Sequence, residues 1–406
     1  MNKILDTQPI SSPDALTASP RLRLHYLDGL RGLAALYVVF HHASQGPFGR
    51  VAQSGIKGWL TNWILYGHLA VDVFIVLSGF CLVLPVIKSK EIRGGTVAFY
   101  KRRAHRILPP FYFALLLSLP INFAIHKIGN HPLVTPKALL ANILLLQDWL
   151  PIYNVLDGPL WSVAAEWKIY FLFPLLICIW KRFHAIGLLA AAAAIGYGIT
   201  FTSLLMHYPS SLSNTCPWYV FLFGMGICAG TLTANTSVAQ PILTHLLRNF
   251  AIVAFLVLAM LLVMYPAPAQ GQADLYTTHF PIIDTVAGAL VAASLLLLYR
   301  SVINEKMSWP LRVLCWPPLV RLGTFAYSIY LIHIPFLWLA AGGLHRLGLT
   351  DAHKVAQAAV LFLVVIPIII ALAYVFFLVC ERPFLNTRKR ETFAETEQEA
   401  ALSPAP

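Results

Sequence analysis

Apolar runs about 20 residues long recur along the whole of this sequence, and they restrict its fold more than any other feature. A run of that length crosses a lipid bilayer as an α-helix, which pairs all of its backbone polar groups internally. Charged residues make up 11% of the chain, against about 25% in soluble proteins. We therefore predict an all-α polytopic membrane protein with about ten transmembrane helices, near residues 28–45, 66–87, 104–126, 160–180, 185–206, 215–233, 248–266, 281–300, 318–341 and 356–380.

The distribution of Lys and Arg predicts how these helices are oriented. If the N-terminus is cytoplasmic, 21 of the 29 Lys and Arg residues fall in cytoplasmic segments, six in external segments and two within spans. Cytoplasmic loops carry the excess of positive charge, so both termini are expected in the cytoplasm. Membrane orientation thereby explains the formal net charge of +12, and we expect no nucleic-acid partner.

The sequence predicts one domain with short flanking segments. Residues 24–386 form the predicted membrane domain, and 1–23 and 387–406 are predicted to be disordered and cytoplasmic. No apolar region precedes the first span, so we expect that span to act as an uncleaved targeting signal. The run 137–148 is too short to cross and predicts an interfacial or re-entrant helix. The six cysteines lack CxxC spacing, so neither a disulfide framework nor a metal site is expected.

The first predicted span contains ionisable residues that hydrocarbon does not tolerate unless they are paired or face a cavity. They are Asp28, Arg31, His41 and His42. At 100° per residue, Arg31 and His42 differ by roughly 20° and share one face of a helix. His41 points roughly 80° away from Arg31. His42 is therefore the histidine aligned with the polar face, roughly 16 Å above Arg31 along the helix axis.

Further ionisable residues fall into two groups once the orientation is applied. The outer half of the membrane is predicted to hold His42, His68, Asp72, Glu166, Lys168 and His333. The inner surface is predicted to hold Arg31, Lys101, Arg102, Arg103 and Arg106. The inner, basic group suits the phosphates of a nucleotide-like cytosolic donor. The outer group suits proton abstraction from a hydroxyl, so the pattern predicts an enzyme that joins a cytosolic donor to an acceptor within the membrane.

Six motifs then resemble one known family. In chain order they are "DGLRGLAALYVVFHH", "VDVFIVLSGF", "YKRRAHRILPPFY", "PLWSVAAEWKIYFLFPLL", "AYSIYLIHIPF" and "ERPF". Their order and spacing are similar to those of the acyltransferase-3 family of integral membrane acyltransferases, over about residues 24–386. The resemblance implies transfer of an acetyl or other short acyl group from acyl-CoA to hydroxyls of cell-surface carbohydrates such as O-antigen or exopolysaccharide.

The resemblance also implies roles for particular residues. The family's Arg and His on the first span match Arg31 and His42, and its carboxylate after the Trp-Ser pair matches Glu166. Its arginines at the start of the third span match Arg102, Arg103 and Arg106. Three positions depart from the family pattern: His41, Trp167 and Lys168. The extracytoplasmic domain fused to some relatives is not expected here, so the membrane domain or a partner handles the acceptor.

Each candidate residue also has a structural interpretation. The three arginines at the third span would satisfy the positive-inside rule without any ligand. Glu381 and Arg382 are interpreted as a structural pair, and Tyr327, Ser328 and Tyr330 as packing residues. The remaining alternatives are a backbone-bonded His42, an Arg31–Asp28 ion pair, a contact of Glu166 with Lys168 or Tyr170, a helix-capping Asp72 and an interfacial His68.

The sequence thus favours an inner-membrane O-acyltransferase without a permanently bound cofactor. We expect acyl-CoA, acetyl-CoA first, as the donor, bound by Arg31, Arg102, Arg103 and Arg106. His42, with Glu166 or Asp72 orienting it, is the expected catalytic base, and the acceptor is a carbohydrate or lipid-linked glycan. A proton-coupled transporter is the alternative, since intramembrane His, Asp and Glu also form proton relays. A third possibility is a non-enzymatic partner of a surface polymer.

Overall fold

The computed structural model describes residues 24–48, 55–129, 132–149, 156, 158–206, 215–233, 241–267, 275–349 and 353–385. Every regular element in these ranges is a helix, as predicted. The segments 1–23 and 387–406, predicted to be disordered, lie outside the described residues. The helices are α1 (His25–Phe48), α2 (Gly55–Thr61), η2 (Asn62–Tyr66), α3 (Leu69–Ser89), α4 (Gly95–Gly129), α5 (Pro136–Ile143), α6 (Leu160–Leu205), α8 (Tyr219–Leu232), α9 (Pro241–Met264), α10 (Leu275–Thr278), α11 (Phe280–Ile303), α12 (Trp309–Leu314), α13 (Pro317–Thr324), α14 (Ala326–Arg346), α15 (Lys354–Val360), η5 (Leu361–Val365), α16 (Ile366–Phe376), η6 (Phe377–Glu381) and α17 (Arg382–Leu385).

Seven of the described helices are long and apolar enough to cross a membrane. They are α3, α4, α6, α9, α11, α14 and the continuous helix from α15 to α17. Helix α8 has 14 residues and is shorter than a span, and α1 is not among the seven, although both coincide with predicted spans. The class of the fold is therefore confirmed, whereas the number of ten spans and the cytoplasmic termini stay predictions.

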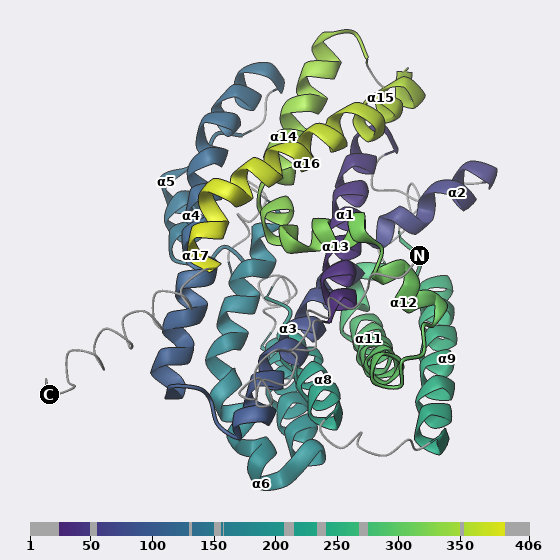
Figure 1. Ribbon diagram of the computed structural model, residues 1–406. Coiled ribbons are helices and arrows are strands. Elements are labelled where there is room, and N and C mark those ends of the chain that lie inside the picture. Colours follow the sequence, from purple (N-terminus) through teal and green to yellow (C-terminus); the bar gives the residue numbers. More distant parts are fainter. Residues whose placement is uncertain are drawn as a thin grey trace, which may run out of the picture.

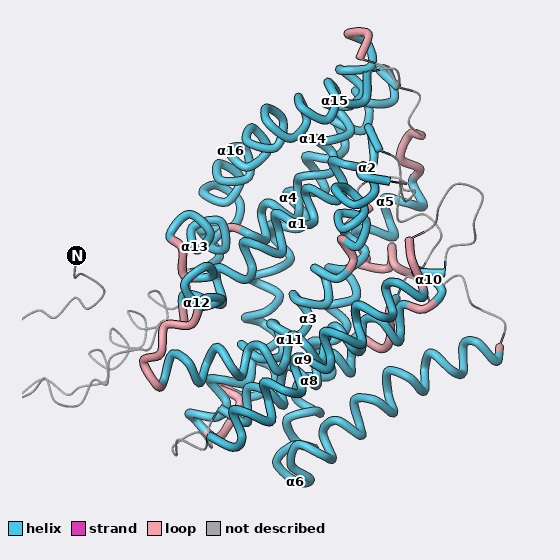
Figure 2. Tube along the Cα trace, turned by 90° about the vertical axis from the view of Figure 1, so that its right-hand side faces the viewer, coloured by secondary structure: helices cyan, strands magenta, loops and turns pink. Residues whose placement is uncertain are grey.

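Helix α6 contains two of the predicted spans, 160–180 and 185–206. These are two helices that meet at a kink at His184, whose φ of 57° and ψ of −159° are not helical. No Gly or Pro lies at residues 181–184, yet the kink falls between the two predicted spans. Figure 2 shows one arm of α6 running along the edge of the molecule.

The last helix is interrupted by two π-helical turns, in which one extra residue is accommodated per turn. The first is η5, between α15 and α16, and the second is η6, between α16 and α17. The second turn ends at Glu381, which is buried and accepts a hydrogen bond from the Ser328 hydroxyl of α14 at 2.5 Å. Ser328, predicted to be a packing residue, therefore also has a polar role.

The helices form two groups that meet at the centre of the molecule (Figure 1). Helices α1, α4, α14 and α16 gather in the upper part of the view, and α3, α6, α8, α9 and α11 in the lower part. Within the first group α14 packs against α1, α4 and α16, and within the second α3 and α11 pack against α8. Helices α1 and α3 also contact each other, which joins the two groups.

Small residues allow the closest of these helix contacts. A Cβ atom at Gly226 of α8 would lie 2.0 Å from the carbonyl oxygen of Val76 in α3. A Cβ atom at Gly323 of α13 would lie 1.7 Å from the carbonyl oxygen of Asp28 in α1. Both distances are shorter than any real contact, so only glycine permits these crossings, as is common between membrane helices. The second crossing fixes the start of α1, where Arg31 lies.

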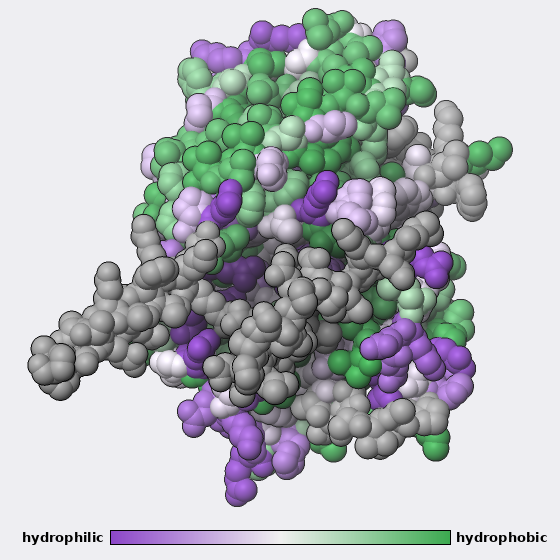
Figure 3. All heavy atoms as spheres, in the orientation of Figure 1, coloured by the Kyte–Doolittle hydropathy of each residue, from purple (hydrophilic) through white to green (hydrophobic). Residues whose placement is uncertain are grey.

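The surface has the hydrophobic character of a protein in contact with lipid. Figure 3 shows hydrophobic residues covering much of the upper half of this face, around α14 and α16, with polar residues along the top edge. Large apolar side chains are exposed on α9 and α16, among them Phe255, Val263 and Val375. Because a hydrocarbon environment does not penalise such exposure, these faces fit the bilayer contact that the sequence predicts.

Candidate active site

A cavity of about 230 Å³ lies where the two groups of helices meet, lined by side chains from α1, α3, α4, α6 and α14. The fold brings together at this cavity four residues predicted from the sequence: Arg31, Arg103, Arg106 and Glu166. The other predicted site residues, which do not line it, are His42, Asp72 and Arg102. The predicted site is thus divided between the cavity and two neighbouring regions.

Three guanidinium groups give the cavity its positive charge. Arg31 donates to Asp28 Oδ1 at 2.8 Å and to Cys81 Sγ at 3.1 Å, so the ion pair proposed as its structural alternative is present and the side chain still lines the cavity. Arg103 lies over the Phe99 ring, and its buried Nε has no hydrogen-bond partner among the described residues. Arg106 is exposed and places its charge at the cavity edge.

Arg102 is separated from this set by its own contact. Arg103 and Arg106, three residues apart, share a face of α4 and line the cavity. Arg102 is also on the same side as Arg106, four residues away, but its guanidinium donates to the Arg93 carbonyl oxygen at 2.6 Å and does not line the cavity. Its placement with the other two in one binding group is not matched by the structure.

Glu166 is held by hydroxyl groups from two helices. Ser78 of α3 donates to Glu166 Oε1 at 2.7 Å, and the Tyr170 hydroxyl donates to the same oxygen from one turn further along α6. The two hydroxyl oxygens are themselves 2.6 Å apart. The contact with Tyr170 is therefore present, and the contact with Lys168 is not, because Lys168 pairs with another carboxylate. These bonds fix the orientation of a carboxylate that lines the cavity.

The two histidines of α1 have different surroundings. His41 Nδ1 lies 2.7 Å from the Ile64 carbonyl oxygen and must donate to it. Its Nε2 then accepts from the side-chain amide of Gln45 at 2.9 Å. Both ring nitrogens of His41 are thus used in holding η2 and the end of α1 together. His41 therefore has a structural role, and the assignment of the catalytic role to His42 stays a prediction.

His42 connects to the cavity through two other rings. Its ring centroid lies 5.3 Å from that of His333 in α14, which is fully buried. His333 Nδ1 donates to the Tyr330 carbonyl oxygen at 2.7 Å, which leaves Nε2 as an acceptor without a partner among the described residues. The rings of His333 and Tyr330 are 5.7 Å apart, and Tyr330 lines the cavity. His42 therefore lies behind the cavity wall rather than on it.

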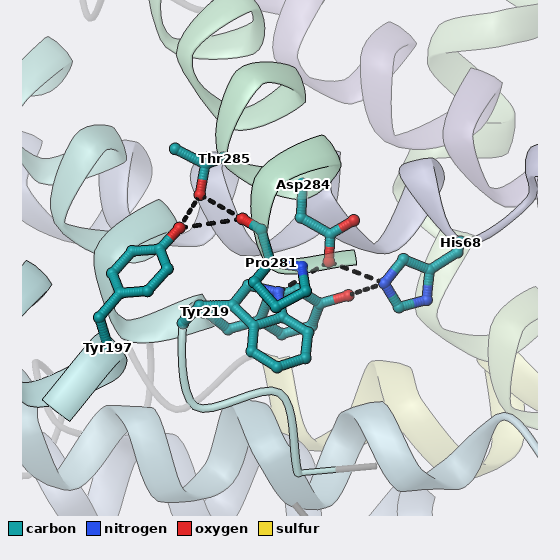
Figure 4. A network of polar contacts seen from close by, with 7 residues as sticks. His68, Tyr197, Tyr219, Pro281, Asp284 and Thr285 are labelled. Atoms are coloured by element: carbon teal, nitrogen blue, oxygen red, sulfur yellow. Dashed lines mark hydrogen bonds and ion pairs between the residues drawn. The ribbon is translucent and has the colours of Figure 1, made fainter. Parts of the chain in front are cut away.

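Asp72 belongs to a different cluster, near the start of α3. A nitrogen of His68 and carboxylate oxygens of Asp72 and Asp284 lie within 4.8 Å of one another. Both aspartates are fully buried. Figure 4 shows the adjoining polar network, in which Asp284 Oδ2 lies 3.0 Å from His68 Nε2 and accepts from the Trp218 indole at 2.8 Å. The sequence interpretation of His68 as interfacial and of Asp72 as a helix cap or a catalytic partner did not anticipate this cluster.

Asp284 was not singled out from the sequence, although a signal for it exists. It is a lone carboxylate within the apolar run "FPIIDTVAGALVAASLL", the same feature that drew attention to Asp72. Its neighbours in the structure come from η2–α3 and from the residues just before α8, which are distant along the chain. No local spacing predicts that partnership.

Lys168 was expected near the acceptor, and it lines a second, larger hollow. It forms an ion pair with Asp148 and lies 5.4 Å from the centroid of the Trp149 ring. Burial raises the pKa of Asp148, and the ammonium group of Lys168 opposes that effect. The hollow has a volume of about 930 Å³ and is otherwise mostly apolar, between the two arms of α6 and the residues before α8.

Comparison with known proteins identifies the chain. The profile of the acyltransferase-3 family, described as an acyltransferase domain, matches residues 24–378. The chain belongs to this family. It is similar to acyltransferase MdmB of Streptomyces mycarofaciens, with 26% identity over 95% of this chain and 98% of the relative. No solved structure matches the chain.

For two further relatives the match covers a smaller part of this chain or of the relative. The protein is 32% identical to protein 2 in the picA locus of Rhizobium radiobacter, over 38% of this chain and 80% of the relative. It is 22% identical to the peptidoglycan O-acetyltransferase OatA of Listeria monocytogenes, over 83% of this chain and 53% of the relative. The chain thus spans about half the length of the OatA protein. Family and relatives together identify a membrane acyltransferase and give no support to the transporter alternative.

Proposed function

We propose that this acyltransferase transfers an acyl group, acetyl first of all, from cytosolic acyl-CoA to a hydroxyl of a cell-surface carbohydrate or lipid-linked glycan at the inner membrane. The observation that carries the proposal is the cavity in which Arg31, Arg103 and Arg106 lie with Glu166. The orientation predicted from Lys and Arg places the arginines on the cytoplasmic side. The name of the relative OatA, a peptidoglycan O-acetyltransferase, supports a glycan acceptor.

The arginines would bind the donor through its phosphates. Guanidinium groups bind phosphate by paired, charge-assisted hydrogen bonds, and the unpartnered Nε of Arg103 has such capacity to spare. A cavity of about 230 Å³ is smaller than the roughly 300–1,000 Å³ of usual ligand pockets. It therefore suits the narrow arm that carries the thioester, with the nucleotide end outside near the exposed Arg106.

His42 would act as the general base at the far end of the donor, once the His333 and Tyr330 rings that separate it from the cavity move aside. In the transfer the acceptor oxygen bonds to the thioester carbonyl carbon while its proton passes to His42. The carbon–sulfur bond then breaks, and the departing CoA sulfur takes the proton back from His42. An O-acyl ester and CoA thiol result, and the imidazole ends neutral. His333, whose Nδ1 is fixed by the Tyr330 carbonyl, would orient His42 from α14.

Glu166 would position the acceptor within the cavity. Ser78 and Tyr170 both donate to its Oε1 and so hold one oxygen in place. Because Oε1 is held, the direction of the other carboxylate oxygen of Glu166 is also fixed. That oxygen can accept a hydrogen bond from a hydroxyl of the glycan. Positioning of this kind lowers the entropy that must be lost before reaction.

The test uses purified protein in nanodiscs with radiolabelled acetyl-CoA and a membrane extract of the native host as the source of acceptor. Release of free CoA and transfer of label to the extract are followed for the wild type, His42→Ala and His41→Ala. We expect a general base to contribute roughly 100- to 10,000-fold, so His42→Ala should lose turnover by that factor. His41→Ala, corrected for the fraction of folded protein, should retain it.

Three outcomes would contradict the proposal or a part of it. Loss of turnover only in His41→Ala would mean that the ring bonded to Ile64 and Gln45 performs the chemistry and that His42 does not. A folded wild-type protein that neither binds acetyl-CoA nor releases CoA would reject acyl-CoA as the donor. Label that appears in protein or lipid but in no carbohydrate would reject the glycan acceptor and leave the donor assignment intact.

A further inference from the structure

The cluster of His68, Asp72 and Asp284 combines closely spaced ligand-type atoms with complete burial of its two carboxylates. Its three ligand-type atoms lie within 4.8 Å of one another. Both carboxylates have no exposed surface, and both lie in apolar helices, α3 and α11. Both oxygens of Asp72 and one oxygen of Asp284 have no hydrogen-bond partner among the described residues. Two buried carboxylates with unpartnered oxygens therefore lie beside one imidazole.

Such an arrangement is stabilised by a neutralising partner, a bound cation or a shared proton. Burial of an unpaired carboxylate is strongly unfavourable, and a second carboxylate at short distance adds repulsion. The printed partners of the cluster are neutral donors: the Trp218 indole at 2.8 Å from Asp284, and the Tyr219 hydroxyl at 2.9 Å from His68 Nε2. No salt bridge to Lys or Arg reaches either aspartate within the described part of the chain.

We propose that His68, Asp72 and Asp284 bind a divalent metal cation of the Zn²⁺ or Mn²⁺ class. One imidazole and two carboxylates are a ligand set that these ions accept. The double positive charge of the cation balances the two negative charges of the carboxylates. The sequence predicted no metal site, because that expectation rested on the spacing of the cysteines, and Asp284 is distant from His68 and Asp72 along the chain. The proposal is independent of the proposed acyl donor and acceptor.

The surroundings of the cluster have the form of a metal site's outer shell. Trp218 fixes one Asp284 oxygen by its indole N–H. The His68 ring is held between flat partners, with centroid distances of 3.9 Å to Phe280 and 5.7 Å to Trp161. Outer contacts of this kind orient ligands and support metal affinity. Figure 4 shows the imidazole directed at the Asp284 carboxylate and the Tyr219 hydroxyl.

The burial of the ligands indicates a structural cation rather than a catalytic one. Catalytic metal sites keep a position open to substrate, whereas both aspartates here are fully buried. The cation would join the start of α3 to α11 and to the residues that lead into α8. It would thereby fix the outer end of α3, whose Val71 and Phe74 line the neighbouring cavity.

The experiment measures metal content by plasma mass spectrometry on the purified full chain, together with thermal unfolding. We expect about one Zn²⁺ or Mn²⁺ per chain in the wild type. That content should fall at least tenfold in His68→Gln, Asp72→Asn and Asp284→Asn. The control is Glu381→Gln, which alters a buried carboxylate bonded to Ser328 elsewhere in the bundle and should keep the metal. Removal of the metal by a chelator should lower the Tm, and added Zn²⁺ or Mn²⁺ should restore it.

Several results would overturn the proposal. Wild-type protein without stoichiometric metal, and without a rise in Tm when Zn²⁺ or Mn²⁺ is added, would reject it even if every cluster variant fails to fold. An infrared band of a protonated carboxylic acid that disappears in Asp72→Asn would assign a shared proton to the cluster instead. Equal metal content in the wild type and a folded Asp284→Asn variant would place the metal elsewhere.

Discussion

The cavity and the cluster of His68, Asp72 and Asp284 are both polar sites inside an apolar bundle, but their charged side chains differ in exposure and in pairing. In the cavity the charges are paired or partly exposed: the side chains of Arg31 and Asp28 are 27% and 25% exposed and bond to each other. In the cluster both carboxylates are fully buried and largely unpartnered. The first arrangement allows a ligand to enter and leave, and the second fits the resident cation proposed for it. Variants of the cavity should therefore change turnover, and variants of the cluster should change stability.

Among the variants that distinguish the cavity from the cluster, Glu166→Gln is expected to have the largest effect, a loss of kcat without a loss of stability. The amide oxygen of glutamine can still accept from Ser78 and Tyr170, so the Tm should change little. The loss of the negative charge should lower kcat by about 100-fold if Glu166 positions the acceptor. Turnover and thermal unfolding of the same preparation check this. A reduced Tm with normal kcat would assign Glu166 to the structure alone.

The next effect distinguishes donor binding from catalysis. Arg103→Lys keeps the charge and loses the planar pair of donors, so the KM for acetyl-CoA should rise about 10-fold with kcat nearly unchanged. Acetyl-pantetheine, which lacks the nucleotide phosphates, should show the same KM with the wild type and the variant. An equal rise of KM for both donors would mean that Arg103 does not bind phosphate.

A smaller effect, this time on stability, is expected in the cluster. Trp218→Phe removes the indole donor of Asp284 and should reduce the free energy of unfolding by about 1–3 kcal/mol. Thermal unfolding in detergent should show a lower Tm, with activity kept at low temperature. Trp161→Phe is the matched control, since its contact with His68 is ring stacking, which phenylalanine preserves. Equal loss of stability in both variants would show that ring volume, not the hydrogen bond, matters.

The smallest effect is expected from Arg102→Ala. Its guanidinium donates to the Arg93 carbonyl and does not line the cavity. The KM for acetyl-CoA should therefore stay within about twofold of the wild-type value, as for surface substitutions in general. A tenfold increase would show that the donor extends over this face of α4, and the binding site would then have to include it.

The class of the fold was predictable because apolar length alone dictates membrane helices. The boundary between the fourth and fifth predicted spans was also predictable from hydropathy, since the kink at His184 separates two helices where the polar residues 181–184 interrupt the apolar run. Helix α8 coincides with a predicted span but has only 14 residues. Hydropathy marks where an apolar run lies and not how much of it becomes helical.

The site was predictable where residues share one helix. Helical periodicity explains why Arg103 and Arg106 lie together, but it does not exclude Arg102, which is four residues from Arg106 and about 40° from it; the contact of Arg102 with the Arg93 carbonyl could not be predicted. Contacts between helices were not predictable, because they depend on packing between distant segments. Asp72 was therefore assigned to the chemistry of His42, whereas its neighbours are His68 and Asp284.

The π-helical turn η6 gives the last helix one place where its length can change without turning Glu381 away from its partner. A π turn contains one residue more than an α turn, so deleting one residue from Phe377–Val379 allows an ordinary α-helical turn to form there. The loss is absorbed within that turn, so Glu381 keeps its direction around the helix axis and its hydrogen bond from the Ser328 hydroxyl. A deletion in a helix made only of α turns would instead rotate every later residue by about 100°. The chain can thus lose one residue beside a buried carboxylate and keep the contact of that carboxylate.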